Sequence, residues 1–155
     1  MEAGLSDCLE VFRGATRLAL RDGHLSNGEK RLLVKLAHAL RLNEEEPRMV
    51  YNSVVGGTEL DSGRQLGGQE KVMVYEQVLE AVLIHTDRSE DELMLIAYLR
   101  KAFQISDAEH RAITRSLDRQ LEQIIHRNVL QDFRMRLDDT MEKVGGIFDR
   151  IGIQL

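Results

Sequence analysis

The fold is decided by a stretch that occurs twice, as SNGEKRLLVKLAHALRL at residues 26–42 and, 63 residues later, as SEDELMLIAYLRKAFQI at residues 89–105. Each copy opens with a serine followed three residues later by a glutamate, the capping box that satisfies the free amides of a helix start. Apolar residues then recur at the spacing of one helix face. A short turn and a second capping box follow in each copy, Asn43–Glu46 and Ser106–Glu109. The sequence therefore predicts a duplicated helix-turn-helix unit.

The segments around these stretches complete the two halves. Helical patterns at residues 5–21 and 69–85 lead into the two units, so the repeats span about residues 5–55 and 69–127. Between them, residues 56–68 carry five glycines. Because glycine-rich stretches break regular structure, we expect these residues to form a flexible linker.

The C-terminal segment, residues 128–155, predicts a further helix and then an apolar tail after a Gly-Gly pair. Two interpretations of the tail stay open: it packs back on the domain formed by residues 1–127, or it binds a partner. The residues that would contact a partner are Ile147, Phe148, Ile151, Ile153 and Leu155. The expected fold is all-α, a compact bundle of about seven to eight helices made of two repeated helix-turn-helix units plus a C-terminal helix.

Composition excludes several classes of function. A formal net charge of −5 argues against a dedicated nucleic-acid binder, which usually carries a basic stripe. The lone cysteine, Cys8, suits a reducing cytosol, and no apolar stretch approaches the length of a membrane span. The sequence contains no phosphate-binding glycine loop and no nucleophile elbow. We therefore expect a cytoplasmic protein that is not an enzyme.

One polar constellation carries ligand chemistry. The turn Asp22-Gly23-His24 precedes the first unit, and His85-Thr86-Asp87 precedes the second. Together with the two capping glutamates, these turns supply the oxygen and nitrogen ligands that divalent metals use. The candidate metal ligands are Asp22, His24, Glu29, His85, Asp87 and Glu92, and the candidate ions are calcium, magnesium and manganese. The alternative is that Glu29 and Glu92 serve only as capping residues.

A calcium EF-hand does not fit these turns. Counted from Asp22, the twelfth position of the loop is Leu33, and counted from Asp87 it is Tyr98. An EF-hand requires a bidentate glutamate there. The sequence thus excludes the standard loop in both halves.

The string ALRDGHLSNGE at residues 19–29, followed by an apolar stripe that ends in Leu40-Arg41-Leu42, resembles the tellurite-resistance TerB-like superfamily. The hallmark of that superfamily is a helix, then Asp-Gly-x-aliphatic-Ser/Thr-x-x-Glu, then a helix with a short terminal turn. The superfamily also carries a degenerate second copy, to which residues 85–109 are similar. The resemblance covers about residues 5–125.

The resemblance implies a bacterial, all-helical, non-enzymatic bundle tied to tellurite resistance, chemical stress, phage resistance or membrane-associated complexes. It implies a divalent-metal role for Asp22 and Glu29, with Asp87 and Glu92 as their second-copy counterparts. The second copy departs from this pattern at His85 and Thr86, where Asp and Gly are expected.

These observations predict a helical protein-interaction module, modulated by a divalent metal, within a stress-response or membrane-associated complex. We expect a protein partner, no nucleic acid and a cytoplasmic location, peripheral to the inner face of a membrane through partners. Whether the chain also forms a homo-oligomer stays open. The alternative is a metal-responsive sensor, in which metal binding is itself the primary function.

Overall fold

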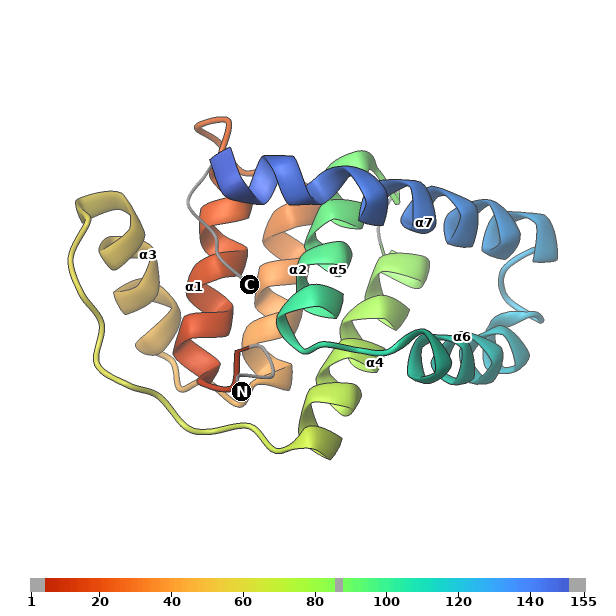
Figure 1. Ribbon diagram of the computed structural model, residues 1–155, viewed down its shortest axis with the longest axis horizontal. Helices are drawn as coiled ribbons and strands as arrows, with labels where there is room; N and C mark the ends of the chain where they lie inside the picture. Colours follow the sequence, from red (N-terminus) through yellow and green to blue (C-terminus); the bar gives the residue numbers. More distant parts are fainter. Residues whose placement is uncertain (1–4, 86–87, 151–155) are drawn as a thin grey trace.

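The computed structural model describes residues 5–85 and 88–150, and this part of the chain contains seven helices. They are α1 (Cys8–Ala19), α2 (Asn27–Ala39), α3 (Glu46–Gly56), α4 (Gly68–His85), α5 (Glu90–Ala102), α6 (Asp107–Leu121) and α7 (Arg127–Arg150). The predicted all-α bundle is confirmed (Figure 1). None of the described helices is both long enough and apolar enough to cross a membrane.

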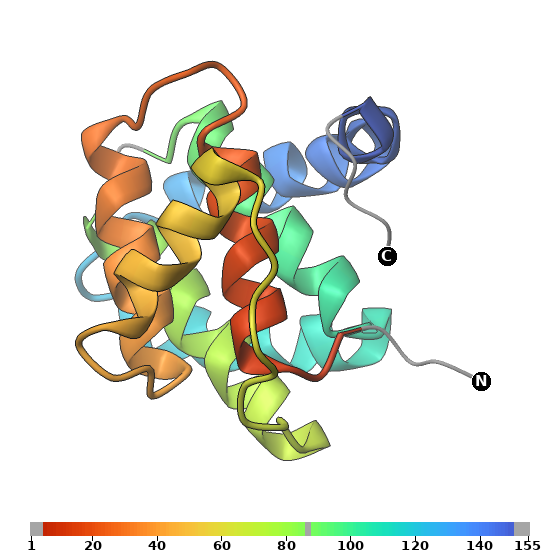
Figure 2. The same ribbon diagram turned by 90° about the vertical axis from the view of Figure 1, so that its left-hand side faces the viewer.

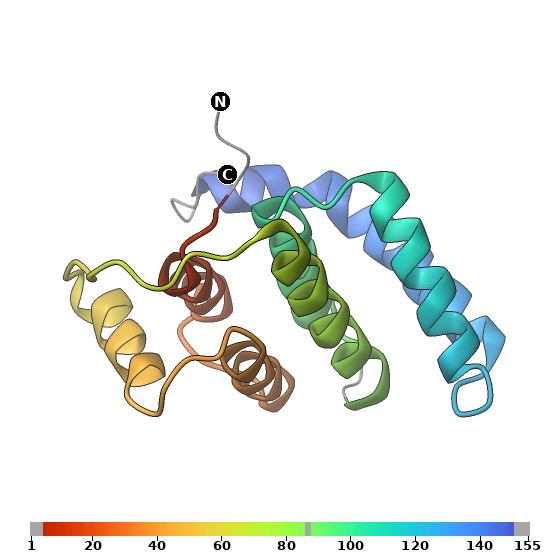
Figure 3. The same cartoon turned by 90° about the horizontal axis from the view of Figure 1, so that it is seen from below.

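The two halves pack as a pseudo-symmetric pair. Helix α2 packs against α4, and its counterpart α5 packs in the same way against α1. In Figure 2, α3 lies in front of α1 and α2, and Figure 3 shows the four helices in the centre of the molecule, with α3 at one edge and α6 at the other. The duplication seen in the sequence is therefore also a duplication of packing among these four helices.

Matching helix ends set the register of the two copies. Three capping boxes form as predicted, at Ser26, Ser89 and Ser106. Asn43 and Glu46 also exchange hydrogen bonds, but α3 begins only at Glu46, after two bent residues.

Both α2 and α5 end in the same left-handed turn. Its residue has a positive φ, 59° at Arg41 and 51° at Gln104. The next amide donates back to the carbonyl five residues earlier, from Leu42 to Ala37 and from Ile105 to Arg100. This is the Schellman arrangement, which satisfies the last carbonyl groups of a helix. The short turns predicted at these two places are confirmed.

Helix α5 lies at the centre of the core and meets α1 closely. The buried Tyr98 hydroxyl donates to the Val11 carbonyl oxygen over 2.9 Å. A Cβ atom on Gly14 would lie only 2.0 Å from that hydroxyl oxygen. Glycine is therefore required where the two helices cross.

The glycine-rich segment between α3 and α4 is held along α1, rather than forming the flexible linker we expected. Asp7 caps α1, and its second carboxylate oxygen accepts a hydrogen bond from the Gly63 amide at 2.7 Å. The Cys8 amide donates to the Arg64 carbonyl, and Arg64 bonds Glu70 at the start of α4. These contacts join residues far apart in the sequence, so composition alone could not predict them.

Helix α7 covers one side of the second half. It begins beyond the far end of α6 and runs back across α5 (Figures 1 and 3). Its buried face is formed by Leu130, Phe133, Leu137, Thr140, Val144 and Phe148. The helix continues through the Gly-Gly pair at which we expected it to end.

Candidate functional site

An apolar groove with a volume of about 590 Å³ is bounded by α1, α2 and α3. Its floor is formed by Phe12, Leu33 and Ala37, all of which are buried. Val34 of α2 and Tyr51 of α3 stand at its rim, with exposed fractions of 58% and 44%. Concave apolar surfaces of this size are the usual form of binding sites.

A second hollow of about 330 Å³ lies on the other side of Val34, between α2 and α4. Its lining includes Arg31, Lys35 and His85. Val34 borders both hollows, which together mark a track across the outward side of α2. We call this track the α2 face; its outward side chains are Lys30, Arg31, Val34, Lys35 and His38.

The sequence of α2 explains why Val34 is exposed. Leu32, Leu33 and Leu36 form the buried stripe of the helix. At about 100° per residue, Val34 lies well away from this stripe. The core therefore does not use this apolar side chain, which stays 58% exposed.

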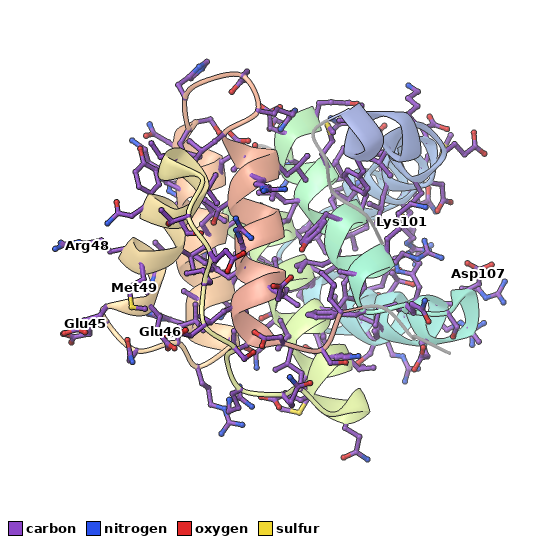
Figure 4. The ribbon with its side chains drawn as sticks, turned by 60° about the vertical axis from the view of Figure 1, so that its left-hand side comes forward. Glu45, Glu46, Arg48, Met49, Lys101 and Asp107 are labelled. Atoms are coloured by element: carbon purple, nitrogen blue, oxygen red, sulfur yellow. The ribbon has the colours of Figure 1, made fainter. Side chains whose placement is uncertain are left out.

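The outer side of α3 is also open to solvent. Glu45, Arg48 and Met49 point away from the body of the molecule (Figure 4). Met49 is exposed, as are the other two side chains. Helix α3 therefore borders the groove as a wall packed on α1 from one side only.

The structure separates the candidate metal ligands into two groups. Asp22 and His24 are exposed, and their closest side-chain atoms, Oδ1 and Nδ1, are 3.9 Å apart. His85 is exposed at the end of α4, where its carbonyl accepts a hydrogen bond from Arg31. Asp87 lies outside the described residues.

Glu29 and Glu92, by contrast, are buried and lie close together. A Cβ atom on Gly28 would lie 2.7 Å from the Glu92 carboxyl carbon. The starts of α2 and α5 therefore meet at this point, and each glutamate closes the capping box of its own helix.

Arg21 supplies the positive charge at this junction. Its guanidinium lies 2.5 Å from Asp91 and 3.7 Å from Oε2 of Glu29, an oxygen that accepts no hydrogen bond among the described residues. Burial raises the pKa of the Glu29 carboxyl, while the Ser26 amide hydrogen bond lowers it. Across the described part of the chain, no three His, Cys, Asp or Glu side chains are arranged to hold a metal ion.

The residues predicted to bind a partner at the C-terminus fall in two regions. Phe148 is buried and packs edge-on against Tyr98, with ring centroids 5.9 Å apart. Ile147 is half-buried against the core. Ile151, Ile153 and Leu155 lie outside the described residues. A partner could use Phe148 only after α7 had detached.

Sequence reasoning missed a buried polar pair in the second half. His110 of α6 is buried, and its Nδ1 atom lies 3.1 Å from the Tyr75 hydroxyl. Burial, and next the positive charge of Arg100, lowers the pKa of His110 to about 4. The only signal in the sequence was the tyrosine 35 residues earlier, which the local helix pattern does not connect to His110.

No protein-family model, curated protein or solved structure significantly matches this chain.

Proposed function

We propose that this chain is a non-enzymatic protein-interaction module and that its partner binds the α2 face. The proposal rests on the apolar groove of about 590 Å³ beside α2, with Val34 and Tyr51 exposed at its rim. An exposed apolar surface around a hollow is costly in water unless a partner covers it. The floor of the groove offers packing surface, and its charged groups are confined to its borders.

Catalysis is less well supported by the same site. The titratable side chains that line the groove are Lys30, His38, Glu44 and Tyr51, and none of them is buried. Reaction centres generally hold such groups in a desolvated constellation that tunes their pKa values. The groove fits the recognition of an apolar surface better than it fits a chemical step.

We further propose that the module is TerB-like and acts in a cytoplasmic stress-response or membrane-associated complex. The support for this is the string at residues 19–29 and the pair of helix-turn-helix units. A TerB-like protein should change the tolerance of its host to tellurite or to a related chemical stress. Deleting its gene and measuring growth on tellurite tests this; unchanged growth under all such stresses would remove the assignment.

Divalent-metal modulation is a second, weaker proposal. The buried Oε2 of Glu29, which accepts no hydrogen bond among the described residues, favours a cation at the junction of α2 and α5, but the Arg21 guanidinium already lies there. Calorimetry with calcium, magnesium and manganese, together with melting curves, tests whether a metal binds. Binding that Asp22→Asn or Asp87→Asn weakens would support a metal role, including the sensor alternative. An absence of heat and of any change in Tm would reject both.

A photo-crosslinking amino acid tests the α2 face directly. Placed at position 34 in the full chain and expressed in its host, it should form an adduct of defined mass with one protein. The matched control is position 135 on the outer side of α7, where Met135 is 68% exposed. Adducts from position 135 but not from position 34 would move the partner to another surface and overturn the proposal.

A further inference from the structure

The second half of the molecule contains the counterpart of the α2 face, and there the surface is covered. The 63-residue offset that relates the two units places Ala97 at the position of Val34 and Thr114 at that of Tyr51. The exposed fractions fall from 58% to 0% and from 44% to 8%. The cause is α7, which packs along α5.

Helix α7 occupies the position that corresponds to the open groove. Leu130 and Phe133 of α7 share one small cavity with Leu79 and Thr114. Under the same offset, Leu79 and Thr114 are the counterparts of Thr16 and Tyr51, which line the open groove. At the other end of α7, Phe148 packs on Tyr98, the counterpart of Lys35 in the second hollow. The track over α2 thus has the course that α7 follows over α5.

The covered surface on α5 and the open surface on α2 differ in charge. We call Leu93, Met94, Ala97, Tyr98 and Lys101, the counterparts of the outward residues of α2, the α5 face. Leu93, Met94 and Tyr98 are buried there, whereas the α2 face has Lys30, Arg31 and Lys35 in their places. Lys101, at the end of the α5 face, lies on the side of the molecule away from Met49 of α3 (Figure 4).

The basic side chains of the α2 face favour a partner that carries acidic groups beside an apolar stripe. Lysine and arginine can lay their aliphatic stems against an apolar helix and keep their charges at its edge. Complementary charge across such a rim selects the partner and speeds its association. The residues that line the two hollows include three basic side chains, those of Lys30, Arg31 and Lys35, and one acidic side chain, that of Glu44.

We propose that the α2 face binds an acidic amphipathic helix of another protein, seated across α2 as α7 is seated across α5. This inference rests on the proposed function and names its ligand. The buried residues of α7 show the spacing that such a helix needs, with steps of three and four residues from Leu130 to Phe148. Apolar anchors at that spacing fill the groove and pack on Val34, and glutamate or aspartate at its flanks meets Lys30 and Lys35.

Two synthetic helical peptides test the proposal against the full chain. Both carry leucine and phenylalanine at the spacing of the buried α7 residues; one has glutamate and the other has lysine at the flanking positions. Fluorescence anisotropy should show at least about tenfold tighter binding of the glutamate peptide, with a Kd that rises with salt. Equal Kd values for the two peptides, or no binding of either, would overturn the inference.

Variants of the chain place the peptide on the α2 face. Val34→Asp should weaken the glutamate peptide at least about tenfold, and the control Met135→Asp should leave its Kd within about twofold. Lys30→Glu with Lys35→Glu should reverse the preference, so that the lysine peptide binds more tightly. Both lysines lie outside the buried core, and melting curves check that the variants fold. If Val34→Asp has no effect, or the charge reversal leaves the preference unchanged, the α2 face is not the site.

Other occupants give different results. A dimer in light scattering that Val34→Asp converts to a monomer would assign the face to a second copy and overturn this inference. A crosslink from position 34 to a basic or extended segment of a partner would also overturn it, while the proposed function would stand. The absence of any crosslink from position 34 would instead reject the proposed function.

Discussion

The α2 face and the α5 face share one backbone framework, yet one is open to solvent and the other lies inside the core. Their helices begin with the same capping box and end with the same left-handed turn. They differ in a few side chains, such as Val34 and Lys35 against Ala97 and Tyr98, and in the presence of α7. A duplicated unit can therefore keep the packing of its first two helices in both copies while only one copy keeps its outer surface available. The outer-surface residues and α7, rather than the repeat itself, therefore distinguish the two halves.

The largest expected effect comes from loosening α7. Phe133→Ala removes a buried ring that packs between α4 and α6, so the free energy of unfolding should fall by about 3–5 kcal/mol. The matched change on the open face, Val34→Ala, should alter it by less than about 0.5 kcal/mol. Urea unfolding followed by circular dichroism measures both.

Losses of similar size in the two variants would contradict the comparison, because they would mean that Val34 is covered in solution. A small loss for Phe133→Ala alone would mean that α7 contributes little to the second half.

The stability of the second half should depend on pH through His110, which occupies the position that Pro47 has in the first half. Because the folded state lowers its pKa to about 4, the unfolded chain binds more protons between about pH 4 and its ordinary pKa of 6.5. The stability that neutral His110 contributes is therefore complete above pH 6.5 and is lost as the pH falls towards 4. The loss is about 1.4 kcal/mol per pH unit inside this window.

Urea unfolding of the unmodified chain and of His110→Gln at several pH values measures this difference. The variant should show a shallower loss between pH 6.5 and 4, and the control His38→Gln, at an exposed position, should follow the unmodified chain. Parallel curves for all three proteins would show that His110 does not titrate as its burial requires.

The helices and their repeat followed from the sequence because their signals are local. A capping box such as Ser26–Glu29 lies within one turn, and a buried stripe lies within one helix. These signals predicted the all-α class, both short turns and the helical character of the C-terminal segment. The TerB-like assignment and the metal role rest on the same local strings and stay predictions.

What the sequence could not predict depends on contacts between distant residues. Nothing in the α7 stripe indicates whether it would cover the first half or the second, so the open groove could not be located. Arg21 is an ordinary helix-end arginine until the fold places Glu29 and Asp91 around it. The glycines of residues 56–68 predicted a flexible linker. The hydrogen bond that holds Gly63 to Asp7 joins residues 56 positions apart, so nothing in the local sequence indicates it.

The smallest of these effects tests the symmetry of the helix crossings. Gly14 and Tyr98 form the α1–α5 crossing, and their counterparts Gln77 and Lys35 belong to the α4–α2 crossing. Gly14→Ala would force the Tyr98 ring to move, which should cost about 1–3 kcal/mol of unfolding free energy. That exceeds the gain of up to about 1 kcal/mol expected from the better helix propensity of alanine. Thermal melting should therefore show a lower Tm for Gly14→Ala and almost no change for Gln77→Ala, because Gln77 is exposed. Tyr98→Leu should cost less unfolding free energy in the Gly14→Ala variant than in the unmodified chain, because it removes the clash. If the two losses instead add, the ring is not what keeps position 14 a glycine, and the close approach of α1 to α5 needs another cause.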